Sequence, residues 1–423
     1  MLRLNKELKV KLEVFKKDKR AYYSFLILAF LFIATLPAEL ICNVRPIVIL
    51  VEGKPFFPIF ISYNEKDFGG SRPSEPDYKS ARFLRILKGL PEPSLAVSLL
   101  DEKNSFGLQL DDFEDEESKE EPSFSIGLDD FEESGEPVTP PAETTSAIPL
   151  TPRDAWLLWP PIRYDYKYIP TESNTGNVVL AAPYRTPARN GEGFIESSWE
   201  DGHYLGTDDR GRDVLARLIY GFRISLIFGA SLAITGTLIG CLIGGAQGFF
   251  GGWVDLAGQR ITEIWGSIPR LYILIILSSF LVPSVLILFL ILNLTAWMGI
   301  AAYIRAEFLK VRNFEFVKSA KGLGVSNFTI MRRHILPNSL TPVITFFPFE
   351  VTAGIFALVS LDFLNLGVPS PAPSIGELLA QGKSNLQALW ILLPTFTALT
   401  SMIVLLTFIG EGIRNAFDPR KTL

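Results

Sequence analysis

The stretch RAEFLKVRNFEFVKSAKGLGVSNFTIMRRHILPN, residues 305–338, decides the fold, because it is a hydrophilic segment between two apolar ones. Its first half has the residue spacing of a short helix. Gly322 and Gly324 interrupt that helix, since glycine adopts positive φ angles at little cost. Ser326 is a favoured cap for a second helix, which Pro337 ends. The pattern therefore predicts a helix, a glycine turn and a second helix.

The charge of this stretch indicates on which side of a membrane it lies. Residues 305–333 contain seven Lys or Arg against two acidic residues, Glu307 and Glu315. Loops with an excess of basic residues stay on the cytoplasmic side of a bilayer. We therefore expect the stretch to face the cytoplasm. An ordinary solvated basic loop would have the same charge pattern, so the charge alone does not assign a function.

The composition of the chain predicts a multi-span membrane protein. Of its 423 residues 48% are hydrophobic, and they gather into runs of about 20 residues, the length that crosses a bilayer. The net charge of -5 arises from residues 101–136, which carry -13, while the remainder carries +8. Two cysteines, Cys42 and Cys241, fall in or beside predicted spans and indicate neither a disulfide framework nor a metal site.

Six helical spans are predicted, and the first follows a basic start. Residues 1–20 form a cytoplasmic tail with eight Lys or Arg against three acidic residues, and residues 21–42 form the first span. A cleaved signal peptide is the competing interpretation of this start. The other five helices lie in residues 218–423, where the hydrophilic stretch, residues 305–339, joins the fourth and fifth spans.

The third and fourth spans come from one long apolar run, Leu271–Ile304. As a single helix this run would be about 50 Å long, well beyond a hydrocarbon core of about 30 Å. We therefore expect a break near Val282-Pro283-Ser284 that yields two spans. Two crossings also keep the basic stretch 305–333 inside, whereas a single crossing would place it outside.

A large extracytoplasmic insertion, residues 43–217, separates the first and second spans. Glu52-Gly53 is the turn of a predicted hairpin, and a short helix is expected to bury Ala81, Leu84 and Leu87. Residues 90–152 are acidic and too polar to form a core, so they are predicted to be disordered. They contain an acidic-aromatic motif that recurs after 18 residues and is either a pair of partner-binding motifs or a spacer.

The segment GTDDRGRDVLARLIYGFR, residues 206–223, leads into the second span. It predicts an amphipathic helix at the outer membrane surface, capped by Thr207 or Asp208. Within the second span a glycine recurs at every fourth position, which makes a flat ridge where another helix can approach closely. This ridge packs either inside the chain or on a sister subunit. Its members are Gly236, Gly240, Gly244 and Gly248.

Four motifs in order carry a resemblance to a known family: GTDDRGRDVLARLIYGFRIS, RAEFLKVRNFEFVKSAKGLGVS, SLDFLNLG and FIGEGIRNAFDP. Together they resemble the second permease subunit of dipeptide and oligopeptide ABC importers, most closely the Yej type of peptide and microcin C permease. The resemblance covers residues 1–88 and 154–423. It implies an all-α polytopic protein of the bacterial inner membrane, with the six helices of a type I ABC importer permease.

The resemblance also implies partners and site residues. A second permease subunit, a cytoplasmic ABC ATPase and an extracytoplasmic solute-binding protein would assemble with the chain in the lipid bilayer. In a permease core formed by residues 218–423, the stretch 305–339, called the coupling stretch below, would be the coupling loop. Its short helix would insert into a groove of the ATPase, and its small residues would leave one side bare for that contact. The ATPase-coupling residues implied are Glu315, Ser319, Ala320, Gly324 and Ser326.

Asp362 departs from the family pattern, because members usually have LSFLGLG where this chain has LDFLNLG. An ionisable residue near the end of a span is a candidate for the substrate path. A side chain that reaches to the membrane interface is the equally simple alternative. The sequence leaves both interpretations open.

No catalytic, cofactor or metal site is expected, so the chain is predicted not to be an enzyme. The segment GELLAQGKS, residues 376–384, resembles a phosphate loop, but its glycines have the wrong spacing and no strand precedes them. Only His203 and His334 are available as histidine ligands. No nucleic-acid partner is expected either. Permeases for nickel chelates or other solutes, and a membrane-anchored interaction protein acting through the acidic segment, are the alternatives.

Overall fold

The computed structural model describes residues 2–90, 153–170, 178–187, 194–280 and 284–418. It divides into two compact units, one formed by Met1–Val44 with Pro160–Leu423 and the other by Arg45–Trp159. Residues 91–152, which include the acidic repeat and nearly all of the segment predicted to be disordered, lie outside the described residues.

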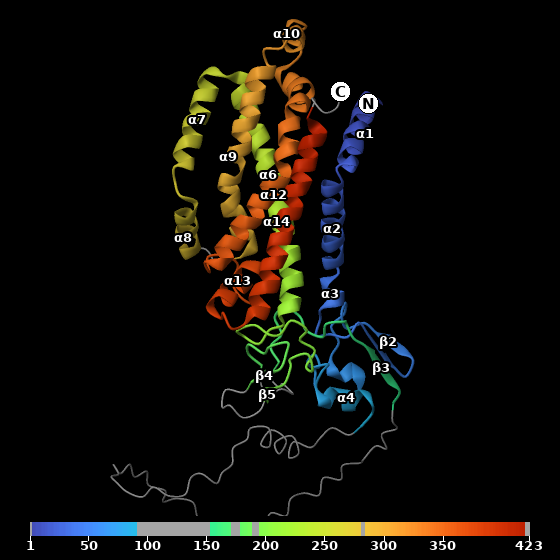
Figure 1. Cartoon of the computed structure of the whole chain (residues 1–423). Coiled ribbons are helices and arrows are strands. Elements are labelled where there is room, and N and C mark those ends of the chain that lie inside the picture. Colours follow the sequence, from blue (N-terminus) through green and yellow to red (C-terminus); the bar gives the residue numbers. More distant parts are fainter. Residues whose placement is uncertain (1, 91–152, 171–177, 188–193, 281–283, 419–423) are drawn as a thin grey trace, which may run out of the picture. The chain divides into compact units, whose positions relative to one another are not determined.

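The larger unit is a bundle of helices (Figure 1). Its helices are α1 (Leu2–Lys17), α2 (Lys19–Thr35), α3 (Ala38–Ile41), α6 (Val214–Phe250), α7 (Gly252–Gly266), α8 (Arg270–Phe280), α9 (Val285–Val311), α10 (Glu315–Gly322), α11 (Asn327–Thr329), the π-helical turn η3 (Ile330–Ile335), α12 (Leu336–Phe363), α13 (Ile375–Ser384) and α14 (Leu389–Phe417). The strands β4 (Thr186–Pro187) and β5 (Phe194–Ile195) pair antiparallel beside them.

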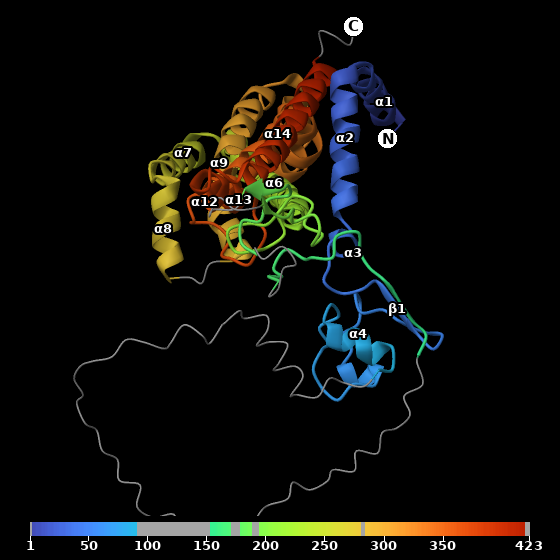
Figure 2. The same cartoon turned by 60° about the horizontal axis from the view of Figure 1, so that its bottom comes forward.

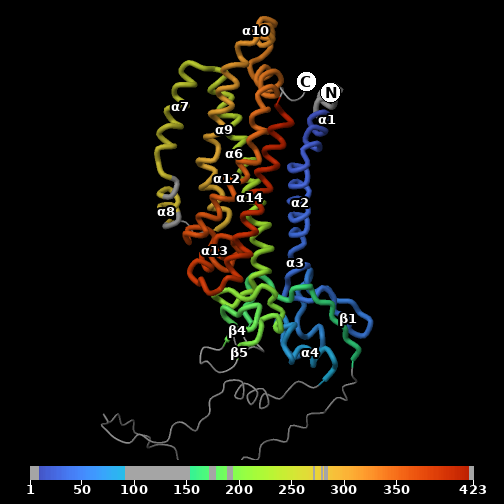
Figure 3. Tube along the Cα trace, in the orientation of Figure 1, coloured from blue at the N-terminus to red at the C-terminus, as the bar shows by residue number. Residues whose placement is uncertain are grey.

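Four helices of the described chain are long and apolar enough to cross a membrane. They are α6, α9, α12 with its preceding turn, and α14, and they run side by side in the centre of the bundle (Figures 1 and 3). The helix α2 flanks α14 on one side, and α7 followed by α8 flanks α9 on the other (Figure 2). With 17 residues, α2 is only slightly shorter than a typical membrane-spanning helix.

The third crossing differs from the prediction. We expected it to begin at Leu271, but α8 has only 11 residues, and the segment that returns along α9 starts with α7 at Gly252. The sequence pattern missed α7 because Asp255, Arg260 and Glu263 interrupt its apolar residues. The predicted break near residues 282–284 agrees with the helix ends, since Ser284 caps α9 by accepting a hydrogen bond from Ile287 N–H at 3.2 Å.

The coupling stretch lies at the same end of the bundle as both chain termini. Figure 1 shows α10 at the top, near α1 and the last turns of α14, whereas α13, β4 and β5 lie at the bottom. The basic N-terminal tail and the basic coupling stretch are therefore on one side, as the charge rule predicts for the cytoplasmic side.

The glycine ridge of α6 packs inside the chain, against α9. A Cβ added to Gly236 would lie 3.2 Å from the carbonyl oxygen of Ala296, and one added to Gly240 would lie 2.9 Å from Ile300 Cβ. The corresponding positions at Gly244 and Gly248 also meet α9. Of the two packing arrangements that the sequence left open, the structure has the internal one.

The segment before the second span is not a separate amphipathic helix. The helix α6 is continuous from Val214 to Phe250. Its cap is Asp213, whose carboxylate accepts a hydrogen bond from Ala216 N–H at 2.7 Å, and not Thr207 or Asp208 as predicted. Both of those residues lie in the preceding loop, where Thr207 Oγ1 donates to the carbonyl oxygen of Val178 at 2.7 Å.

The smaller unit contains a three-stranded antiparallel sheet, so the all-α expectation holds only for the membrane bundle. The strands are β1 (Val48–Val51), β2 (Lys54–Phe56) and β3 (Ala155–Leu158), in the order β2-β1-β3. The hairpin predicted at Glu52-Gly53 is confirmed, with φ angles of 51° and 78°. Beside the sheet lie the 3₁₀ helix η1 (Glu65–Phe68) and α4 (Ala81–Leu87).

The buried face of α4 includes only one of the three residues predicted, Leu87. Phe83, Ile86 and Leu87 are buried in the core of the smaller unit, whereas Ala81 is exposed. Phe83 packs edge-on against Phe68 at a ring distance of 5.3 Å. Burying an aromatic ring removes far more apolar surface from water than burying an alanine, which rotates the helix toward Phe83.

Candidate functional site

The coupling stretch is anchored to the membrane bundle by one face of α10. Val317 is fully buried and Ala320 is 7% exposed, and both pack with Ile330 and Ile335 from η3. The same apolar cluster includes Phe308 near the end of α9. The end of α9, the helix α10 and the start of α12 are therefore held together by a continuous core.

The turn after α10 has the predicted glycine geometry. Gly324 has a φ of +76°, and a Cβ added to it would meet no atom within 4 Å. Glycine is therefore required by the backbone angle and not by crowding. Val325 N–H donates to the carbonyl oxygen of Ala320 at 3.1 Å, which ends the helix. Ser326 then caps α11 by accepting a hydrogen bond from Thr329 N–H at 3.4 Å.

The exposed part of the coupling stretch is apolar and large, which differs from the bare surface predicted. Ala320 faces the core and so cannot contribute to an outer contact, whereas Ser319 and Glu315 are exposed. Glu315 forms an ion pair with Lys318 at 2.9 Å. Exposed bulky apolar side chains surround them. We call these the coupling patch: Phe314 (44% exposed), Phe316 (41%), Leu323 (83%) and Phe328 (71%).

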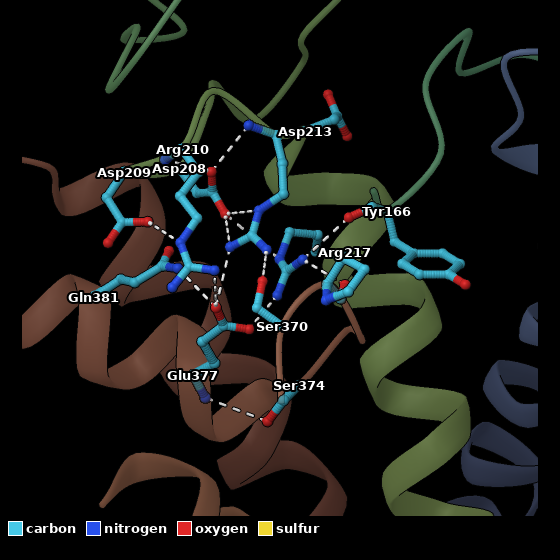
Figure 4. Close-up of polar contacts among 12 residues, drawn as sticks. Tyr166, Asp208, Asp209, Arg210, Asp213, Arg217, Ser370, Ser374, Glu377 and Gln381 are labelled. Atoms are coloured by element: carbon cyan, nitrogen blue, oxygen red, sulfur yellow. Dashed lines mark hydrogen bonds and ion pairs between the residues drawn. The ribbon is translucent and has the colours of Figure 1, made fainter. Parts of the chain in front are cut away.

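At the opposite end of the bundle, four charged residues form a buried ion network. We call Asp208, Arg212, Arg217 and Glu377 the outer network (Figure 4). Arg212 Nε donates to Asp208 Oδ2 at 2.8 Å, and Arg212 Nη2 donates to Glu377 Oε1 at 3.1 Å. Arg217 donates to the other oxygen of Glu377. Both arginines are at most 1% exposed, so their partners must compensate for lost hydration.

The outer network joins α6 to α13, and the cap of α13 extends the contacts to a third helix, α12. Arg217 belongs to the first turn of α6, and Glu377 belongs to α13. Ser374, the cap of α13, accepts a hydrogen bond from Glu377 N–H at 3.2 Å and donates to Asp362 at the end of α12. Asp362 is 5% exposed and also accepts from Val368 N–H at 2.7 Å. It is thus a buried structural acceptor and does not reach to the interface.

A second buried pair supports the start of α6. His203 Nδ1 lies 2.8 Å from Asp213 Oδ2, and the ring of Tyr164 stacks on His203 at 3.8 Å. Tyr164 Oη donates to the carbonyl oxygen of Asp201 at 2.6 Å. Burial raises the pKa of Tyr164 to about 12, so its hydroxyl remains a hydrogen-bond donor at neutral pH.

A mainly apolar cavity with two polar side chains lies between α6, α9 and α12. Its volume is about 200 Å³, and Glu350 from α12 and Thr237 from α6 contribute to its wall. Glu350 lies near the middle of α12 and is half-buried. Seven small residues form much of the remaining wall: Ala233, Gly236, Ala296, Gly299, Ala353, Gly354 and Ala357.

The site residues predicted from the sequence therefore lie at two opposite ends of the bundle. Glu315, Ser319, Ala320, Gly324 and Ser326 lie together in the coupling stretch, whereas Asp362 lies at the other end of α12. The sequence reasoning missed the outer network, because Arg217 and Glu377 are 160 positions apart. It also missed Glu350, although an acidic residue within the apolar run 341–361 was a visible signal.

Comparisons with known proteins give consistent matches. Residues 236–423 match the family described as "Binding-protein-dependent transport system inner membrane component". The "Peptidoglycan transport system permease protein YejE" of Agrobacterium fabrum is 38% identical over 416 residues, 96% of this chain and 92% of that protein. The "Inner membrane ABC transporter permease protein YejE" of Escherichia coli is 36% identical, over 97% and 96% of the two chains. The "Dipeptide transport system permease protein DppC" of Bacillus subtilis is 35% identical, over 52% and 69%.

Proposed function

We propose a function for this chain from its family, because it belongs to the binding-protein-dependent transport system inner membrane components. It is the subunit through which peptides cross the inner membrane. The observation that carries the proposal is the match to two permeases over nearly their full length. The name of a third relative refers to dipeptide transport. Such chains are transport subunits and not enzymes, so ATP hydrolysis belongs to a separate subunit.

The coupling stretch is the contact for that ATPase. Exposed aromatic and aliphatic side chains next to polar ones are typical of the centre of a protein interface. The coupling patch supplies such side chains, and Glu315 and Ser319 supply the polar surroundings. A partner groove that covers Leu323 and Phe328 would remove their apolar surface from water, which stabilises the complex.

Movement of α10 then reaches the membrane through two helices. The helix α9 enters the stretch, and α11 with η3 leads from it into α12. Because Val317, Ile330 and Phe308 share one buried cluster, α10 cannot shift without moving the ends of both helices. Gly324 and Ser326 define the turn that sets the direction of α12. In this proposal Ala320 acts from the buried side, as a small residue that lets α10 lie close to the bundle.

The outer end of the bundle is the surface for the solute-binding protein. The outer network fixes the start of α6, the helix α13 and the end of α12 as one rigid piece. A rigid outer surface is suited to receive a loaded binding protein, because docking then requires no local folding. The second permease subunit would complete the translocation path.

The proposal is tested by pairing transport with co-purification. A Leu323→Asp variant places a charge in the coupling patch, and we expect it to lose the ATPase during purification while inserting normally in the membrane. Leu12→Asp is the matched control, since Leu12 is also exposed (51%) but lies on α1, outside the coupling patch. Peptide uptake should be lost in the first variant and kept in the second. Unchanged co-purification of Leu323→Asp would contradict the assignment of the contact.

Peptidoglycan fragments are a second candidate substrate, favoured by the name of one relative, a peptidoglycan transport system permease protein. They share the peptide part with simple oligopeptides, so one permease could accept both. Microcin C-like conjugates are a third candidate that follows only from the Yej type resemblance. Competition of each compound with labelled peptide for uptake by the complete transporter would rank the three.

Deletion of residues 101–136 separates transport from the alternative of a membrane-anchored interaction protein. If the acidic segment were the working part, its deletion would abolish function. We expect peptide uptake to survive the deletion, because the coupling stretch and the helices of the bundle remain intact.

A further inference from the structure

A groove on the surface of the bundle, between α1, α2 and α14, has no role in the proposed coupling. Its volume is about 310 Å³, which is within the range of clefts that hold a small ligand, about 300–1,000 Å³. Its wall is apolar and largely aromatic. The side chains that form most of this wall are Phe15, Tyr22, Phe25, Ile409, Ile413 and Phe417.

Contacts among the three helices fix the shape of the groove. Asp18 separates α1 from α2, and its carboxylate caps α2 by accepting a hydrogen bond from Ala21 N–H at 3.4 Å. Asn415 of α14 donates to the other carboxylate oxygen of Asp18 at 3.4 Å. A Cβ added to Gly412 would lie 3.0 Å from Phe15 Cε2, so glycine at this position lets α1 lie close to α14. The groove is therefore a built feature of the end of the bundle that carries the coupling stretch.

Basic side chains lie at one end of this groove. Of the described residues that line it, only Lys11 and Lys16 are charged. Lys11 Nζ lies 4.3 Å from the centre of the Phe417 ring, at the end of α14, and Lys16 is exposed. Ile409 lies eight residues before Phe417, about 12 Å away along the helix. The groove therefore has a basic end and, further into the bundle, an apolar one.

The surroundings of the groove match the cytoplasmic surface of a membrane. The helix α1 contains six Lys or Arg against two acidic residues, and a basic helix with apolar side chains lies at that surface and attracts anionic lipid head groups. On α2, Phe25, Phe30 and Ile33 are exposed, which is the surface of a helix in contact with hydrocarbon. A phospholipid carries a phosphate next to its apolar chains, in the same order as the two ends of the groove.

We propose that this groove binds an anionic phospholipid of the cytoplasmic leaflet, whose acyl chain covers Phe25 and Ile409 and whose phosphate is held by Lys11 and Lys16. A lysine ammonium group donates strong, charge-assisted hydrogen bonds to phosphate oxygens. The acyl chain removes the aromatic wall from contact with water at the membrane surface. The inference goes beyond the proposed function, because it concerns a lipid that stays with the protein and not the transported peptide.

The test measures which lipids remain bound to the purified complete transporter. The transporter is reconstituted in nanodiscs of phosphatidylcholine with a minor fraction of phosphatidylglycerol and extracted in mild detergent, and its bound lipids are quantified by mass spectrometry. We expect phosphatidylglycerol to be enriched over the supplied ratio. Lys16→Gln should lower this enrichment about five-fold, the change expected for one basic residue near anionic lipid. Lys9→Gln is the matched control, because Lys9 is exposed on the same helix and does not line the groove.

A second variant tests the apolar wall. Ile413→Trp keeps both lysines but fills the groove, so it should also lower the enrichment. Leu393→Trp, 57% exposed near the start of α14, should leave it unchanged. Equal losses in Lys9→Gln and Lys16→Gln would show that the charge of the whole tail acts, which overturns the inference. An unchanged enrichment in Ile413→Trp, or no enrichment in the parent protein, overturns it too. Bound lipid is measured without transport, so failure of peptide uptake would contradict only the proposed function.

Discussion

The two ends of the bundle differ in which side chains they expose to water and which they bury. At the inner end, the coupling patch leaves large apolar groups such as Leu323 and Phe328 in contact with water. At the outer end, the outer network withdraws two arginines and two carboxylates from water. Exposed apolar groups are stabilised by a partner that covers them, whereas buried charges are stabilised by each other. The inner end is therefore built for assembly and the outer end for rigidity.

The strongest test of this contrast is to remove one charge from the outer network. Arg217→Ala leaves Glu377 buried without its closest partner, and we expect a loss of about 3–5 kcal/mol in folding stability. The measurement is the thermal unfolding midpoint of the purified protein in detergent. Arg223→Ala is the matched control, because Arg223 pairs with the partly exposed Glu39. Equal losses in the two variants would show that burial of the network does not matter.

A smaller loss is expected from the glycine of the inner turn. Gly324→Val places a branched side chain at a φ of +76°, which costs about 1–2 kcal/mol in backbone strain. Because no atom lies within 4 Å of the added Cβ, the strain distorts the turn and not the bundle. Co-purification of the ATPase should be lost while membrane insertion is kept. Gly322→Val is the control, since Gly322 has the same open surroundings without the unusual φ angle. Retained co-purification of the ATPase with Gly324→Val would contradict the assignment of the coupling stretch as the ATPase contact.

The exposed ion pair between Glu39 and Arg223 should contribute less than the outer network. The hydrogen bond from Arg223 lowers the pKa of Glu39 below its ordinary value of 4.5. A carboxyl whose pKa is lowered on folding stabilises the folded state when the pH is above the ordinary pKa. This contribution is lost as the pH falls through the pKa of the folded state. Glu39→Gln should cost at most about 1 kcal/mol at pH 7. The difference in unfolding midpoint between the parent protein and Glu39→Gln should be smaller at pH 4 than at pH 7. A larger difference at pH 4 would contradict a stabilising ion pair between Glu39 and Arg223.

The smallest effect on stability is expected in the coupling patch itself. Phe328 is 71% exposed, so Phe328→Ala should change the unfolding midpoint of the isolated chain by no more than about 0.5 kcal/mol. Its affinity for the ATPase should nevertheless fall, because the lost ring belongs to the contact. A binding titration with the purified ATPase measures this. An Ile234→Ala variant, exposed on α6, is the control that should change neither quantity.

Features set by local chemistry could be predicted from the sequence. The positive φ at Gly324, the cap at Ser326 and the turn at Glu52-Gly53 need only a few neighbouring residues, and the structure has all three. The spans followed from apolar runs, except that α7 carries enough charge to hide its place in the third crossing. The family followed from four motifs in order, and the relatives confirm it.

Features that depend on distant partners could not be predicted. The burial of Ala320 depends on Ile330 and Ile335, and the choice of Asp213 over Asp208 as a cap depends on Arg212 and Arg217 holding Asp208. The packing partner of the glycine ridge required the position of α9. In each case the residue type was compatible with two environments, and only tertiary contacts selected one.

The continuity of α12 has a mechanical consequence. This helix of 28 residues is about 42 Å long, begins directly after the π-helical turn and ends at Phe363. Pro342 and Pro348 lie within it and remove backbone hydrogen bonds, so it is able to bend at these two positions. In the proposed coupling, movement of α10 would therefore tilt the inner part of α12 more than its outer end, which is held through Ser374.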